Sequence, residues 1–131
     1  MAKAIKAKEI VATTPDKVGM LAQVTAVVAG AGVNILAICA YAMDGKAKFL
    51  MLTSDNGKAQ AALKGKNIEV EEADVVSVTL PNKVGAGKEL ADKLAKAGVD
   101  LNYIYGSTGN GSEALLILSA KDVNKAIEAC K

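Results

Sequence analysis

The sequence contains no arginine and no histidine, and each absence excludes a kind of chemistry. All 16 basic residues are lysines, so no planar guanidinium is available to hold a carboxylate, phosphate or guanine through two parallel hydrogen bonds. Histidine is the commonest general base near pH 7, and a zinc site with histidine ligands also requires it. The composition therefore argues against histidine-dependent catalysis and against histidine-ligated metal sites.

Aromatic residues are scarce, at 3% of the chain, and the net charge is only +2. The lysines form no basic stripe. Proteins that bind single-stranded nucleic acids use exposed aromatic side chains and a positively charged groove, and the sequence indicates neither. We therefore expect no nucleic-acid partner.

The two cysteines, Cys39 and Cys130, are far apart in the sequence and show no CxxC spacing. This favours two reduced thiols in a cytoplasmic protein, with a single disulfide bridge or a catalytic thiol as alternatives. The first residues have no apolar signal core, so we predict no secretion signal.

One short pattern occurs twice. Residues 15–21 (PDKVGML) and 32–35 (GVNI) enclose an apolar helical pattern, and residues 81–85 (PNKVG) and 98–101 (GVDL) repeat the arrangement 66 residues later. Apolar residues make up 51% of the 131, which is enough for a buried core. The chain therefore reads as two copies of one small unit.

The periodicity of the first copy predicts strands where side chains alternate and helices where apolar residues recur every three or four positions. Asp44 and Gly45 form a hairpin signal between two of the strands. The expected strands are 4–14, 33–43, 46–54 and 68–72, and the expected helices are 18–31 and a short one from Asn56 to Gly65. In the second copy the expected strands are 75–80, 101–106 and 114–119, and the expected helices are 85–97 and 122–130.

Each copy thus has the order β-α-β-β-α, to which the first copy adds a closing strand. This is the split-βαβ, ferredoxin-like pattern, so we predict an α+β fold with antiparallel sheets covered by helices on one face. The predicted units are residues 1–72 and 73–131. The second unit lacks its closing strand, which leaves the edge of its first strand open. We expect that edge to pair with a strand of the first copy or of another subunit.

No charged residue occurs in residues 18–43. A transmembrane reading of this run is rejected, because two glycines divide it into a helix and a strand and because the second copy carries charges at the matching positions. A helix that is apolar or small on all sides is usually buried on all sides. We therefore expect the outer face of the first helix to pack against another subunit or the other copy; the alternative is an alanine-rich, exposed helix.

Catalytic and cofactor motifs are not convincing. Residues 81–89 lie between a strand and a helix, as a phosphate-binding loop does, but the GxxxxGK[ST] template fails at Asn82 and Glu89. The acidic residues read as solvated faces, and no nucleophile lies beside a base. We predict neither an enzyme nor a cofactor or metal site.

A binding role is better supported by the residues at the helix starts. Gly19 and Gly85 precede helices whose first N–H groups have no partner within the helix, and such a terminus attracts an anion such as a ligand carboxylate. Asn34 both donates and accepts hydrogen bonds, so it suits an α-amino and an α-carboxylate group. In the alternative reading the loop is a plain turn and Asn34 a structural cap.

These repeated motifs resemble the ACT-domain family, small-molecule-sensing modules of βαββαβ fold. The arrangement is most similar to stand-alone tandem ACT proteins. The resemblance implies a non-catalytic regulatory protein that binds an amino acid where paired ACT units meet, with the loop of one unit and the residues after the Gly-Val turn of a neighbour around the ligand. We further expect a homodimer. The runner-up is an interaction or regulatory subunit that docks a partner enzyme and whose ligand sites are vestigial, and the uncharged face of the first helix is the feature that would favour it.

The resemblance nominates two sets of ligand-binding residues. In the second set Asp100 replaces the usual Asn and would repel an α-carboxylate, although it accepts from an ammonium. The first set is Asp16, Lys17, Val18, Gly19, Met20, Leu21, Asn34 and Ile35, and the second is Asn82, Lys83, Val84, Gly85, Asp100 and Leu101.

Overall fold

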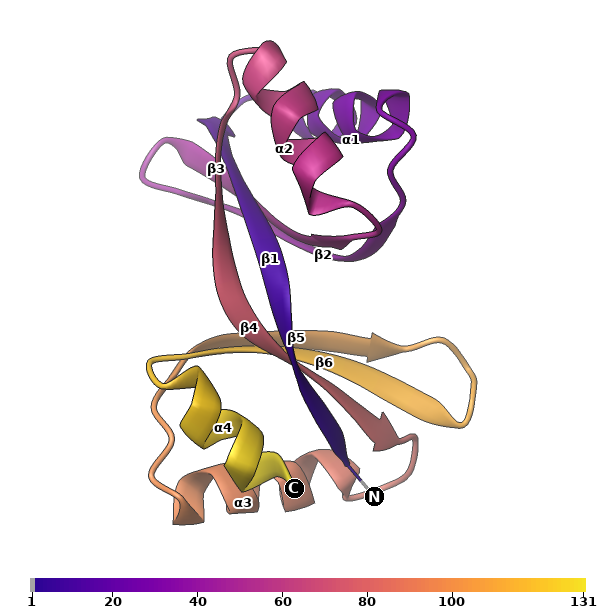
Figure 1. Cartoon of the computed structure of the whole chain (residues 1–131), viewed down its shortest axis with the longest axis vertical. Coiled ribbons are helices and arrows are strands. Elements are labelled where there is room, and N and C mark those ends of the chain that lie inside the picture. The colour runs from indigo at the N-terminus through magenta and orange to yellow at the C-terminus, as the bar shows by residue number, and fades with distance from the viewer. Residues whose placement is uncertain (1) are drawn as a thin grey trace. The chain divides into compact units, whose positions relative to one another are not determined.

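The computed structural model describes residues 2–131 and divides the chain into two compact units (Figure 1). The first unit is Lys8–Ala73, and the second unit consists of Asp74–Lys131 together with the start of the chain up to Ala7. The chain passes from one unit to the other within two long strands, β1 (Lys3–Pro15) and β4 (Glu69–Pro81). The division differs from the predicted 1–72 and 73–131 in these first residues and in Ala73, which belongs to the first unit.

The first unit combines two helices with four strands in the order β2-β3-β1-β4. The hairpin of β2 and β3 turns at Asp44 and Gly45, whose φ angles of 55° and 78° confirm the turn predicted there. The Asp55 carboxylate caps the second helix by accepting from the Lys58 N–H at 3.1 Å. Besides its parts of β1 and β4, the unit contains α1 (Met20–Gly30), β2 (Ile35–Met43), β3 (Lys46–Thr53) and α2 (Asn56–Gly65).

The second unit repeats this plan with the strand order β1-β4-β6-β5. The Asp122 carboxylate caps the last helix by accepting from the Lys125 N–H at 3.0 Å. Figure 1 shows both helices of each unit against one face of its strands. The remaining elements are α3 (Ala86–Lys96), β5 (Leu101–Thr108), β6 (Glu113–Ala120) and α4 (Val123–Cys130).

Two predicted strands, 68–72 and 75–80, are one continuous strand in the structure, β4. The separation expected at residues 73 and 74 was wrong, because no proline or glycine is present there to turn the chain. The same strand therefore closes the first unit and opens the second.

The open edge expected in the second unit is covered by β1. In the strand order β4 lies between β1 and β6, so neither of its edges is free. The side chains of Ala2 and Ala4 pack against the core of the second unit. The start of the chain thus supplies the strand that this unit lacks at its C-terminal end.

Each unit has its own core between the strands and the helices. In the first, Ile10 and Ala12 of β1 pack with Val24 and Val28 of α1. In the second, the matching face of β4 packs with Leu90 and Leu94 of α3 and is formed by Val76, Val78 and Leu80. Among residues 2–131, no helix is both long enough and apolar enough to cross a membrane.

The outer faces of the two first helices differ. The expectation that α1 is buried on all sides is not met within the chain, since only Met20, Val24 and Val28 of this helix are buried. Leu21 is 54% exposed. The outer face of α3 instead carries charges, including an ion pair of 2.7 Å between Lys88 and Asp92. A charge-free but exposed face is left on α1.

Candidate functional site

Backbone hydrogen bonds hold the loop between β1 and α1 in place. The Asp16 N–H donates to the Gly45 carbonyl at 3.0 Å, and the Met20 N–H donates to the Lys17 carbonyl at 3.4 Å. Gly19 precedes the helix with φ 93°, a left-handed conformation that a residue with a Cβ rarely adopts, and no side chain caps the helix. Val18, beside it, is fully exposed. The loop presents an uncapped helix terminus next to an apolar side chain.

The loop before α3 has the same conformation but is fixed more firmly. Gly85 has φ 88°, and Val84 is as exposed as its counterpart in the first copy. The Asn82 amide donates to the Gly111 carbonyl at 3.0 Å, and its backbone N–H donates to the Ser112 carbonyl at 2.9 Å. The side chain at this position thus fixes the loop to the β5–β6 connection.

Asn34 lies at the start of β2, directly after the turn that follows α1. Its backbone exchanges two hydrogen bonds of 2.9 Å with Ser54, one to the serine hydroxyl and one from the serine N–H. Within residues 2–131, no hydrogen bond involves the side-chain amide of Asn34, which is exposed. The amide therefore keeps both its donor and its acceptor capacity.

Asp100 occupies the matching position at the start of β5, but its surroundings are charged. The Lys121 N–H donates to the Asp100 carbonyl at 3.0 Å, which repeats the backbone bond seen between Ser54 and Asn34. The Lys121 ammonium lies 3.7 Å from the Asp100 carboxylate and donates to the Asn102 amide oxygen at 2.8 Å. A lysine thus stands where the first copy has a serine.

Ser54 and Lys121 were missed at the level of sequence. The repeated motifs cover the loop and the Gly-Val turn but end before the last residues of the returning strands. In a β-hairpin the start of the first strand lies opposite the end of the second. The predicted hairpins therefore contained the signal that places these two residues beside Asn34 and Asp100.

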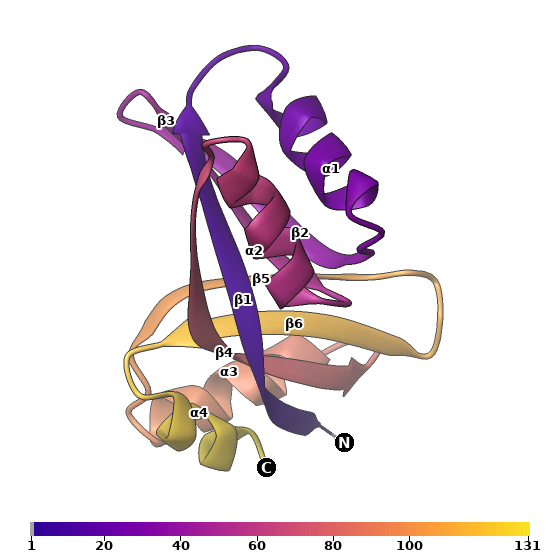
Figure 2. The same ribbon diagram turned by 45° about the horizontal axis from the view of Figure 1, so that its top comes forward.

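The two parts of each nominated site lie at opposite ends of a helix. Figure 2 shows α1 running from the loop that follows β1 to the turn that precedes β2. At 1.5 Å per residue, its 11 residues span about 16 Å, far more than the head group of one amino acid. The structure therefore does not bring Asp16–Gly19 and Asn34 together within one unit.

The remaining nominated residues differ in how far they are accessible. Met20 is buried in the first core, and Ile35 packs against that core while partly exposed. Leu21 points outward, since it is more than half exposed. Leu101 packs against the second core in the same way as Ile35. The exposed large apolar side chains in these segments are those of Val18, Leu21 and Val84.

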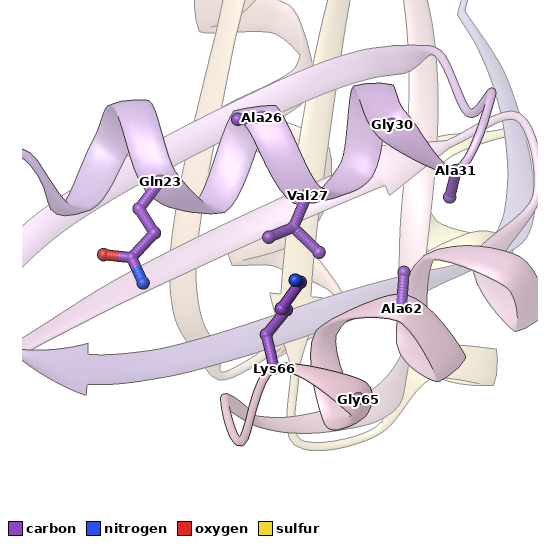
Figure 3. Close-up of a pocket in the computed structure, with 8 residues that line it drawn as sticks. All are labelled: Gln23, Ala26, Val27, Gly30, Ala31, Ala62, Gly65 and Lys66. Carbon is purple, nitrogen blue, oxygen red and sulfur yellow. The ribbon is translucent and has the colours of Figure 1, made fainter.

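A separate cleft of about 630 Å³ lies between α1 and α2 (Figure 3). Gln23 and Lys66 are its two polar side chains, and small residues form most of the rest. None of the nominated ligand-binding residues lines it. The lining residues are Gln23, Ala26, Val27, Gly30, Ala31, Ala62, Gly65 and Lys66.

Both cysteines are free thiols, and they differ in environment. Cys130 is fully buried in the second core, whereas Cys39 on β2 is partly exposed. Burial raises the pKa of the Cys130 thiol above its ordinary value, and the positive charge of Lys93 opposes this with a smaller lowering. The buried thiol is therefore held in its neutral form.

Comparisons with known proteins give the family. A protein from Bacteroides thetaiotaomicron is 30% identical with a TM-score of 0.89, over 96% of this chain and 87% of the other. The ligand-free regulatory subunit of aspartate kinase from Thermus thermophilus is 16% identical with a TM-score of 0.69, over 98% and 93% of the two chains. The corresponding subunit from Thermus flavus is 17% identical with a TM-score of 0.67, over 98% and 94%.

The two Thermus structures support the fold alone, since their sequences have diverged far. No curated protein matches the chain. The model of the ACT domain pair matches residues 6–130, almost the whole sequence. The fold and the repeated motifs agree with that match, and the chain belongs to the ACT domain pair family.

Proposed function

We propose that the protein is a cytoplasmic, non-catalytic regulator that binds an amino acid between paired ACT units, and that two copies of the chain pair to form the sites. The observation that carries this proposal is the placement of the loop and of Asn34 at opposite ends of α1. A ligand that contacts both must lie between two units, with the start of α1 in one unit near the end of the corresponding helix in the other. Each site is then incomplete without a neighbouring unit.

The exposed apolar residues support such pairing. In the strand order, β2 and β5 are the edge strands of their units. Leu36 and Ile38 on β2 are 57% and 41% exposed, and Ile104 on β5 is 50% exposed. An apolar edge strand with unpaired backbone groups is a template for pairing with another chain. A second copy of the chain is the partner we propose for these edges.

The polar groups of the first site suit the head group of an amino acid. The uncapped start of α1 offers N–H groups and the positive end of the helix dipole to an α-carboxylate. The free Asn34 amide of the neighbouring unit accepts from the α-ammonium and donates to the carboxylate. Leu21 and Val18 provide the apolar contacts, which favours a ligand with a small or apolar side chain.

A thermal-shift screen of the twenty L-amino acids at millimolar concentration tests the proposal. A ligand present at 100 times its Kd stabilises the folded protein by about 2.7 kcal/mol. We expect one or a few amino acids to raise the melting temperature of the wild-type protein, and Asn34→Ala to reduce the increase. Absence of a shift with all twenty would contradict amino-acid binding.

The charge-free, exposed face of α1 favours a second function, in which the protein docks a partner enzyme and its ligand sites are vestigial. The α1–α2 cleft adds a hollow lined mainly by small residues to this face. The same screen separates the two proposals. A docking subunit shows no amino-acid response, and Ala26→Lys abolishes its association with the partner while the fold is kept.

A further inference from the structure

We propose that the second unit also binds an amino acid, and that Asp100 and Lys121 together form its charged counterpart of the Asn34 amide. This inference rests on the proposed function, because it assigns head-group recognition to the second of the two sites. The Asp100 carboxylate accepts from the α-ammonium, and the Lys121 ammonium donates to the α-carboxylate. A zwitterionic amino acid is thus the ligand class, in preference to a simple acid or a simple amine.

The first argument is positional equivalence. The N–H of Lys121 bonds the carbonyl of Asp100 just as the N–H of Ser54 bonds the carbonyl of Asn34. The two pairs therefore sit at the same corner of their units, at the start of the edge strand and the end of the strand beside it. Two substitutions, Asn to Asp and Ser to Lys, distinguish the second copy at this corner.

The second argument is charge balance. Asp100 alone would place a single negative charge where an α-carboxylate has to bind. Lys121 lies 3.7 Å away and makes the pair neutral overall. A carboxamide offers one acceptor and one donor group, and the Asp–Lys pair offers the same two capacities in charged form.

The third argument is that Asp100 and Lys121 do not hydrogen-bond each other and can therefore bind a ligand. A separation of 3.7 Å is too long for a hydrogen bond, whereas the Lys88–Asp92 pair on α3 is closed at 2.7 Å. The side chains of Asp100 and Lys121 are 69% and 62% exposed. Both charges thus retain unused hydrogen-bonding capacity toward a ligand.

The fourth argument is that a hydrogen bond holds the Lys121 side chain in place. Its ammonium donates to the Asn102 amide oxygen at 2.8 Å, and the Asn102 amide in turn donates to the Ser119 hydroxyl at 3.1 Å. This chain of hydrogen bonds directs the flexible Lys121 side chain toward the start of β5. A lysine with no such partner would spend most of its time in solvent.

The test uses ¹⁵N-labelled full-length protein, titrated with each of the twenty L-amino acids and followed by NMR. The backbone amides of Asn34 and Ser54 report on the first site, and those of Asp100 and Lys121 on the second. For any amino acid that shifts the second pair, its carboxamide and N-acetyl derivatives are titrated in turn. We expect both derivatives to bind roughly tenfold more weakly, since each removes one of the two charges.

Three variants complete the test. Asp100→Asn and Lys121→Ser should each weaken binding at the second site by roughly tenfold, because each leaves one uncompensated charge. The double variant D100N/K121S reproduces the first copy and should return to within about threefold of wild type. Lys88→Ser, which removes a different exposed lysine from the same unit, is the control and should change nothing.

The outcomes separate this inference from the proposed function. If no amino acid shifts either pair of amides, the proposed function fails and this inference with it. If the Asn34 and Ser54 amides shift while those of Asp100 and Lys121 do not, only this inference is overturned. It is also overturned if both single variants bind the amino acid at the second site as tightly as the wild-type protein does.

Discussion

Val18 and Val84 occupy the same position in the two repeated loops, and both side chains are fully exposed, at 104% and 103% of the reference area. In each case a left-handed glycine follows, Gly19 or Gly85, and fixes the direction of the loop. A single exposed valine needs no explanation, but the repetition in both copies indicates a contact surface. We attribute that surface to the pairing of units.

The first prediction concerns this contact. Val18→Asp should leave the free energy of unfolding of the isolated chain within about 0.5 kcal/mol of wild type, because the side chain makes no contact to lose. The same substitution should weaken self-association, because it places a charge in an apolar interface. Sedimentation velocity over a range of protein concentrations measures the second effect.

A matched substitution controls for the added charge. Ala61 is exposed on α2 and belongs to neither loop, and Ala61→Asp introduces the same carboxylate there. We expect this variant to associate as the wild type does. Equal weakening by both substitutions would mean that net charge, and not the loop, controls assembly.

The second prediction tests the left-handed residue that precedes α1. Gly19→Ala should lower the free energy of unfolding by about 1–2 kcal/mol, since φ 93° places a Cβ too close to the backbone. Gly87→Ala is the opposite case, because Gly87 lies within α3 and a Cβ there meets no atom within 4 Å. That variant should be more stable by about 0.5–1 kcal/mol. Urea denaturation measures the free energy of unfolding of both variants, which should fall in Gly19→Ala and rise in Gly87→Ala.

The third prediction concerns the close contact between β5 and β6. A Cβ at position 106 would collide with the carbonyl oxygen of Leu115 and with the side chain of Leu116. Gly106→Ala should therefore destabilise the protein by about 1–3 kcal/mol in a thermal or urea melt. Adding Leu116→Ala should not restore stability, because the backbone carbonyl remains in place. Recovery in the double variant would show that the side chain alone is the obstacle.

The fourth prediction follows from the buried thiol. Burial raises the pKa of Cys130, so the folded state binds the thiol proton more tightly than the unfolded state does. The resulting stability is fully present below the ordinary thiol pKa of about 8.5 and is lost as the pH rises through the higher folded value. The free energy of unfolding should therefore fall above about pH 8.5.

Thiol substitutions isolate this effect. Cys130→Ala should remove this alkaline decrease, whereas Cys39→Ala should keep it. With iodoacetamide at pH 8, Cys39 should be alkylated first, because Cys130 is inaccessible in the folded chain. An alkaline decrease that persists in Cys130→Ala would assign it to other groups.

The sequence was sufficient for the element types because the local signals agree with the fold. Ile10 and Ala12 of the predicted first strand lie in the first core, and α2 and α4, which Asp55 and Asp122 cap, begin within one residue of their predicted starts. The length of β4 was missed because strand pairing, and not local propensity, decides whether residues 73 and 74 stay extended. The missing closing strand correctly predicted that the second unit's first strand pairs with a strand of the first copy or of another subunit, but the choice of β1 is a long-range outcome that no local pattern contains.

The candidate site was predicted as a set of residues but not as a geometry. The repeat indicated the loop and Asn34, and the resemblance indicated that neighbouring units contribute to one site. The predicted helix over residues 18–31 already separated the loop from Asn34, and the structure adds Lys121 beside Asp100. Side chains contributed by the returning strands depend on hairpin register, which the motif alone does not specify.

The most direct test of the central claim is sedimentation velocity at protein concentrations that span dimer dissociation, with and without the amino acid that most stabilises the protein. Our account places the ligand between two units of different chains, so binding and pairing must be linked and each must strengthen the other. We expect the amino acid to shift the sedimentation boundary toward the dimer at concentrations where the free protein is monomeric. A monomer that binds the amino acid with unchanged affinity, and does not associate in response, would contradict the account.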